Sequence, residues 1–249
     1  MLPERLHALL DGCGGDSSPL TPTLLYNEGW LLRLVLDWLA RNEAAGHPLA
    51  FPPRARWYSE ALLPTPFAAR KRRDHLAEAR THADGVIGHF IIGITGKGDL
   101  SLAPDGTWLV VLEAKLGSPL STGTVHAHHY DQAARSVACM AEVLRRAGRP
   151  PVSMSHLAFY VIAPASRVSS RLLAALAPNS IRGRIEERVS EYGGDKDEWL
   201  EQWLIPTVGR VQVEVLSWED TLAAIAQRDP ESGQALAGFY ESCLRHSGM

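Results

Sequence analysis

Three charged residues, Asp99, Glu113 and Lys115, have the types and the spacing that metal-dependent phosphodiester chemistry needs. Glu113 and Lys115 flank Ala114 at the end of an apolar run that predicts a strand, so both side chains project from the same face. Burying charged groups on an apolar strand costs free energy, unless the charges are paired with each other or serve a function. Carboxylates suit a hard cation such as Mg²⁺ or Mn²⁺, and a lysine can stabilise the charge that develops on a phosphoryl group.

The position of Asp99 follows from a predicted β-hairpin around Pro104-Asp105-Gly106. With a three-residue loop, Asp99 lies opposite Val111 and is a diagonal neighbour of Glu113, about 7–8 Å away. A two-residue loop would place it on the other face. We therefore predict a metal site made of Asp99, Glu113 and the backbone carbonyl of Ala114. Asp84 is the rival acid, and Asp99 is preferred because the hairpin pairs it directly with the strand of Glu113.

Asp99, thirteen intervening residues and then Glu113-Ala114-Lys115 on successive strands resemble the PD-(D/E)XK nuclease superfamily. Gly98 stands where the family name has proline. The resemblance covers about residues 26–164 and implies a core of helix, three strands, helix and strand. It also implies a Mg²⁺- or Mn²⁺-dependent nuclease in which Asp99, Glu113 and Lys115 are catalytic. Lys115 would orient the attacking water or stabilise the charge of the transition state, and both roles stay open.

Two further residues match positions of that superfamily on the helices around the site. Glu28 lies on the apolar stripe of the first helix and corresponds to a glutamate that supplements the metal site; a first-turn glutamate favoured by the helix dipole is the alternative. Gln132 matches the glutamine of the RecB-like branch, although Ser136 stands where a tyrosine would follow one turn later. An ordinary border position on the helix is the alternative for Gln132.

The pattern of apolar residues predicts an α/β fold in which helices flank a central mixed β-sheet. The resemblance implies that the core of this fold is restriction-endonuclease-like. The chain is expected to form a single domain, 1–249, with its core at about 24–165 and a largely helical C-terminal extension at about 166–249. The region from Pro48 to Pro66 is expected to be irregular. Helices are expected at Tyr26–Asn42, Phe67–Arg80, Ala127–Ala147, Val168–Leu176, Ile181–Tyr192, from Ser217 onward and at Ser232–Arg245; strands are expected at Asp84–Ile94, Leu100–Ala103, Leu109–Leu116, Leu157–Ala163 and Val211–Leu216.

The composition is that of an ordinary globular protein, with 45% hydrophobic and 21% charged residues. No apolar run reaches the span of a bilayer, and the N-terminus lacks the pattern of a signal peptide. The three cysteines are scattered, which favours a reduced, cytoplasmic setting and no zinc framework. The histidines of His126-Ala127-His128-His129 more readily begin a helix or line a substrate channel than bind a metal.

A nucleic acid is the expected partner, DNA more than RNA, and the oligomeric state stays open, with a homodimer as one option. The net charge is −3, so such a partner needs a local basic patch. The only dense basic stretch is Arg70-Lys71-Arg72-Arg73, for which a solvated surface is the alternative. Ser118, in the polar loop 117–124, is assigned to nucleic-acid binding as well. A catalytically inactive binding or assembly module, or a buried structural ion pair of Glu113 with Lys115, is the alternative to an enzyme.

Overall fold

A five-stranded mixed sheet forms the centre of the computed structural model, which describes residues 12, 20–42, 46–78, 81–94, 98–121, 123 and 127–247. Strand β2 pairs antiparallel with β1 and with β5, whereas β5, β6 and β7 run parallel to one another. The architecture is therefore α/β with a mixed central sheet, as the sequence predicts. In sheet order the strands are β1 (Arg56–Leu63), β2 (Thr81–Gly88), β5 (Trp108–Ala114), β6 (His156–Ala163) and β7 (Gln212–Ser217).

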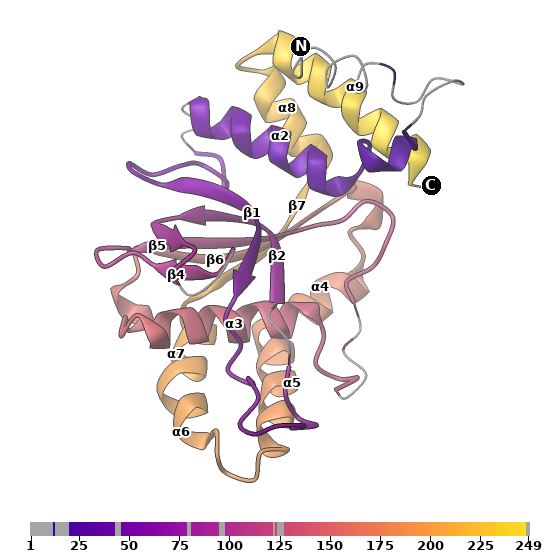
Figure 1. The fold of residues 1–249 in the computed structure, drawn as a ribbon. Helices are drawn as coiled ribbons and strands as arrows, with labels where there is room; N and C mark the ends of the chain where they lie inside the picture. The colour runs from indigo at the N-terminus through magenta and orange to yellow at the C-terminus, as the bar shows by residue number, and fades with distance from the viewer. Residues whose placement is uncertain are drawn as a thin grey trace.

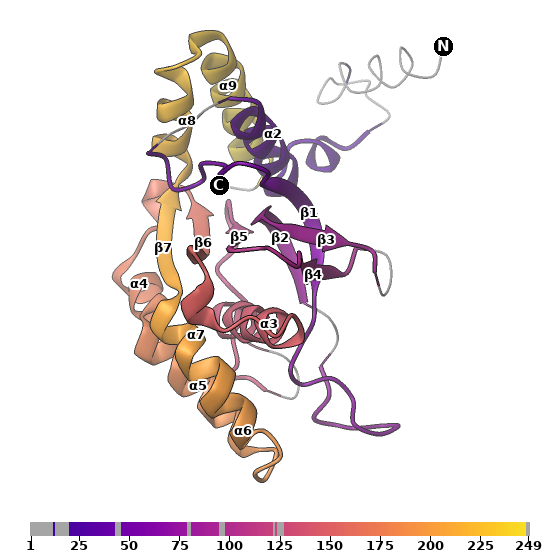
Figure 2. The same cartoon turned by 90° about the vertical axis from the view of Figure 1, so that its left-hand side faces the viewer.

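Helices cover both faces of this sheet, as Figures 1 and 2 show. One face is covered by α2 (Glu28–Arg41), α8 (Trp218–Ala226) and α9 (Pro230–His246); the other is covered by α3 (Gln132–Arg146), α5 (Pro178–Ser190) and α7 (Ile205–Arg210). In β5, Val110 and Leu112 pack toward α2 and Val111 packs toward α3. A strand that is apolar on both faces is typical of a sheet buried between two helical layers. The remaining helical segments are η1 (Pro22–Leu24), η2 (Pro151–Ser153), η3 (Ala165–Arg167), α4 (Ser170–Leu176), α6 (Asp197–Trp199) and η4 (Leu200–Leu204).

The predicted hairpin around Pro104-Asp105-Gly106 is wrong. The expected first strand, Asp84–Ile94, is divided into β2 and a short strand β3 (Phe90–Ile92), and the Leu100–Leu102 strand, β4, pairs with β3 in a separate two-stranded sheet. The break lies at Gly88, which has φ +150°, and a Cβ built there would be 2.1 Å from the carbonyl oxygen of Trp108. This close approach allows β2 to pair with β5 while β3 turns away.

Two expectations for the region before β2 are also wrong. Strand β1 lies within the segment from Pro48 to Pro66, for which the sequence predicts irregular structure, because the prolines there bound the strand instead of interrupting it. Residues 67–78, expected to be helical, form turns. The buried Asp74 carboxylate accepts hydrogen bonds from the backbone N–H groups of Arg70 (3.1 Å) and Leu76 (3.2 Å), and such local bonds compete with a helix.

The other major elements lie close to their predicted positions. Helix α2 begins with an Asn27 N-cap whose side chain accepts from the N–H of Trp30. Ser217 caps α8 by accepting from the N–H of Asp220, which confirms that a helix begins at this position, as the sequence predicts. Strand β7 joins the edge of the same sheet, so residues beyond 166 are part of one layered structure. None of the helices in the described ranges has the length and apolar character to cross a bilayer.

Close packing of α8 against α9 leads to a first prediction. A Cβ at Gly233 would lie 2.4 Å from the Cα and Cβ atoms of Ala226, so Gly233→Ala must push the two helices apart. We expect a loss of about 1–3 kcal/mol in the free energy of unfolding, measured by urea denaturation. Gly238→Ala, in the same helix but with open space around its Cβ position, is the matched control. It should gain about 0.5–1 kcal/mol, and equal effects of the two changes would contradict the packing argument.

Candidate active site

Glu113 lies at the centre of a polar cluster at the end of β5, and its side chain is 1% exposed. The Nζ atom of Lys115 donates to its Oε1 at 2.7 Å. The amide nitrogen of Gln132 donates to the same oxygen from the first turn of α3. The structure thus brings together three of the residues predicted from the sequence.

Asp84 supplies the second carboxylate of this cluster. Gly85 pairs with Leu112, so Asp84 of β2 and Glu113 of β5 are the next opposing positions along the two antiparallel strands. The Asp84 Oδ2 atom accepts a hydrogen bond of 2.8 Å from the backbone N–H of Ala114. Two acids therefore lie side by side across neighbouring strands, on the side of the sheet that α3 covers.

Asp99, the acid preferred from the sequence, lies outside the cluster around Glu113. It is 6% exposed and forms an isolated bridge to Leu62 of β1, and β2 lies between β1 and the strand of Glu113. The strand that follows Asp99 has only three residues and belongs to the small sheet. Asp84 accordingly takes the position that the sequence analysis gave to Asp99.

The start of α3 fixes the side chain of Gln132. Asp131 caps the helix by accepting from the N–H of Ala134, and the Oε1 atom of Gln132 accepts from the N–H of Ser121 at 3.1 Å. Both polar atoms of the Gln132 side-chain amide are hydrogen-bonded, because its nitrogen donates to Glu113. Asp131 also pairs with Arg184 of α5, which ties this corner to the next helix.

The electrostatics of the pair fit a divalent cation. Burial and the neighbouring Asp84 carboxylate raise the pKa of Glu113 to about 8, against the opposing effect of Lys115. A hard cation would remove this repulsion between like charges. The described residues hold no group of three or more acidic, histidine or cysteine side chains placed for a metal. Mg²⁺, however, usually binds through one or two carboxylates together with waters and substrate phosphates, so Asp84 and Glu113 fit it.

Lys115 is also held through its backbone. Its carbonyl oxygen accepts a hydrogen bond of 2.9 Å from the indole nitrogen of Trp218, the first residue of α8. Its N–H donates to the carbonyl of Ile162 in β6 at 2.8 Å. Because Trp218 is fully buried, the backbone at the end of β5 is anchored both from the helical layer of α8 and from the neighbouring strand.

Glu28 is not brought into this cluster. It is the first residue of α2 and lies near Cys243 of α9. Burial, with the nearby charge of Glu28, raises the pKa of the Cys243 thiol to about 12. Since α2 and α9 cover the face opposite α3, the expected approach of Glu28 to Glu113 is not what the structure describes.

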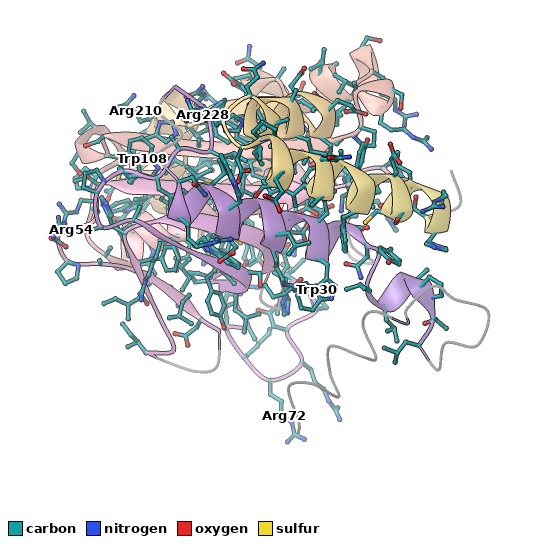
Figure 3. The ribbon with its side chains drawn as sticks, turned by 90° about the horizontal axis from the view of Figure 1, so that it is seen from above. Trp30, Arg54, Arg72, Trp108, Arg210 and Arg228 are labelled. Carbon is teal, nitrogen blue, oxygen red and sulfur yellow. The ribbon has the colours of Figure 1, made fainter. Side chains whose placement is uncertain are left out.

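The basic stretch at 70–73 divides into two parts. Arg70 is held by Asp74 (3.0 Å) and Asp195 (2.6 Å) and lies over the ring of Tyr192, so it fastens its loop to the end of α5. Lys71, Arg72 and Arg73 are exposed, and Figure 3 shows Arg72 projecting outward from the body of the molecule. Nucleic-acid binding by these three residues stays a prediction.

A pocket of about 720 Å³ adjoins the cluster at the carboxyl ends of β5 and β6. Lys115 lines it, and so does Ser118, which the sequence analysis assigned to nucleic-acid binding. His129 lines it too, with ring nitrogens 3.4 Å from Glu187 and 3.7 Å from Glu191. His126 lies outside the described residues.

The sequence analysis overlooked three arginines of this pocket, Arg167, Arg171 and Arg184. They are dispersed over the segment after β6 and form no dense basic run, so no local signal marks them. Only the general tendency of ligands to bind at the carboxyl ends of parallel strands could have drawn attention to this segment.

No family model, curated protein or solved structure matches the chain. The similarity to PD-(D/E)XK nucleases therefore rests on residue types and on their order along the chain.

Proposed function

We propose that this protein is a metal-dependent nuclease of the restriction-endonuclease-like type that hydrolyses phosphodiester bonds of nucleic acids, DNA in preference to RNA. The observation that carries the proposal is the convergence of Asp84, Glu113, Lys115 and Gln132 at the end of β5. Two carboxylates, a lysine and a glutamine that meet at one strand end form a donor set suited to phosphoryl chemistry.

Each of these side chains has a separate task in the proposed reaction. Asp84 and Glu113 would hold Mg²⁺ or Mn²⁺, with the carbonyl of Ala114 as the further ligand suggested by the sequence. The metal supplies positive charge that polarises the phosphoryl oxygen and makes water more acidic. Lys115 would stabilise the negative charge of the transition state or orient the attacking water. Gln132 would keep the Glu113 carboxylate in position, since its amide is itself held by Ser121.

A cleavage assay with several substrates tests this function. Linear, circular and single-stranded DNA, and RNA, are incubated with the full chain in Mg²⁺, in Mn²⁺ and in excess chelator. We expect cleavage only with metal, and greater cleavage of DNA than of RNA. Cleavage that persists in chelator would contradict the proposal. Absence of cleavage of every substrate, combined with tight binding of nucleic acid, would favour the alternative of an inactive binding module.

A further inference from the structure

The pocket beside Lys115 has a cationic rim. Among the described residues that line it are four lysines and arginines, of which Arg184 is paired with Asp131 and Lys115 with Glu113. Arg167 and Arg171 are exposed at the start of the segment that follows β6. Such a concentration of positive charge on a chain of net charge −3 is a local feature that suits phosphate groups.

The inner wall of the same pocket is apolar. Leu120 comes from the loop after β5, Val161 from β6 and Leu172 from α4. Few ligands need both an apolar wall and several guanidinium groups, but a nucleotide offers matching parts: a flat base for the wall and a phosphate for the rim.

The size of the pocket distinguishes a single strand from a duplex. A volume of about 720 Å³ is in the range of sites for one small molecule, about 300–1,000 Å³. B-DNA has two backbones, separated by grooves about 6 and 12 Å wide, and both cannot enter such a space. One unpaired nucleotide can enter it.

We propose that this pocket binds one unpaired nucleotide of a nucleic-acid strand, with its phosphate at Arg167 and Arg171 and its base against the apolar wall. This inference rests on the proposed nuclease function and specifies its substrate as a single strand or an unpaired end. Because Lys115 lines the pocket and bonds to Glu113, a nucleotide bound there places its neighbouring phosphodiester beside the carboxylate pair.

Binding measured in the presence of a chelator tests the pocket apart from the chemistry. The probe is a short single-stranded oligodeoxynucleotide with a fluorescent label, compared with the blunt duplex of the same sequence. The Arg167→Ala/Arg171→Ala protein is compared with the Arg41→Ala/Arg245→Ala protein, whose exposed arginines lie on α2 and α9, across the sheet. Thermal melting checks that every variant is folded.

We expect wild type to bind the single strand more tightly than the duplex. The pocket variant should lose roughly tenfold or more in affinity for the strand, and its slope of log K against log salt should be shallower by about 0.7 because one phosphate is no longer neutralised. The control variant should bind as wild type does. Thymidine monophosphate should compete with the strand more strongly than thymidine.

The pocket assignment would be overturned if both double variants bound the single strand with equal affinity, or if wild type bound the duplex as tightly as the single strand. Neither outcome would affect the cleavage result. Conversely, intact binding that depends on Arg167 and Arg171, without any metal-dependent cleavage, would overturn the proposed nuclease function and leave the pocket in place. The two failures are therefore distinguishable.

Discussion

Asp84→Asn is expected to lower the metal-dependent cleavage rate by at least about 100-fold, whereas Asp99→Asn should keep it within a few-fold of wild type. Asparagine retains an oxygen that can accept the hydrogen bond from the N–H of Ala114, so the strand end keeps its geometry and loses only the negative charge. Asp99 bridges to Leu62 of β1, and none of the contacts described for Glu113 involves it, so the proposal gives its charge no part in the chemistry. Single-turnover cleavage of single-stranded DNA in Mg²⁺ measures both rates.

The comparison of these two variants decides which acid belongs to the site. Because Asp99 is buried, the rates are compared at a temperature at which thermal melting shows both variants to be folded. Loss of cleavage in Asp99→Asn with retention in Asp84→Asn would mean that the contacts at the end of β5 do not define the active centre.

Glu113→Gln is expected to remove both cleavage and the stabilisation of the protein by metal. In wild type, Mg²⁺ at a hundredfold excess over its Kd should stabilise the fold by about 2.7 kcal/mol, which corresponds to a rise of roughly 5–10 °C in Tm for a chain of this size. The variant should show no such rise, because a neutral amide is a far weaker ligand than a carboxylate. Differential scanning calorimetry with increasing Mg²⁺ measures the effect.

The amide oxygen introduced by Glu113→Gln can still accept hydrogen bonds from Lys115 and Gln132, so the metal-free variant should remain folded. Mg²⁺ titration of the Arg41→Ala protein, whose change is exposed on α2, serves as the control and should reproduce the wild-type shift. An equal Tm rise in Glu113→Gln and in wild type would show that the metal binds elsewhere. No Tm rise in wild type would remove the basis for metal dependence.

The sequence predicts the helices and central strands well where the signal is local. The apolar stripe of α2, the buried run of β5 and the Ser217 cap are set by residues a few positions apart. Prediction fails at 67–78, because the turn there depends on the buried Asp74 carboxylate and on Arg188, a fully buried residue of α5 that reaches the carbonyl of Leu76. A contact across so long a sequence separation leaves no periodicity in either segment.

For the site, Glu113, Lys115 and Gln132 could be found because their types and order are informative. The choice between Asp84 and Asp99 could not be made correctly, because it depends on which strand pairs with β5. The turn-like Pro-Asp-Gly sequence favoured pairing with the segment just before it, which follows Asp99. The available clue was the length of the two strand segments: only three residues form the strand after Asp99, whereas β2, which carries Asp84, spans eight.

The hydrogen bond from Trp218 to the carbonyl of Lys115 spans 103 positions of the chain. During synthesis, the strands that carry both carboxylates leave the ribosome well before the indole that completes the anchor of their backbone. A nascent or prematurely released chain that stops short of residue 218 therefore lacks this anchor, along with α8 and α9. Full assembly of the strand end therefore requires synthesis to have passed residue 218.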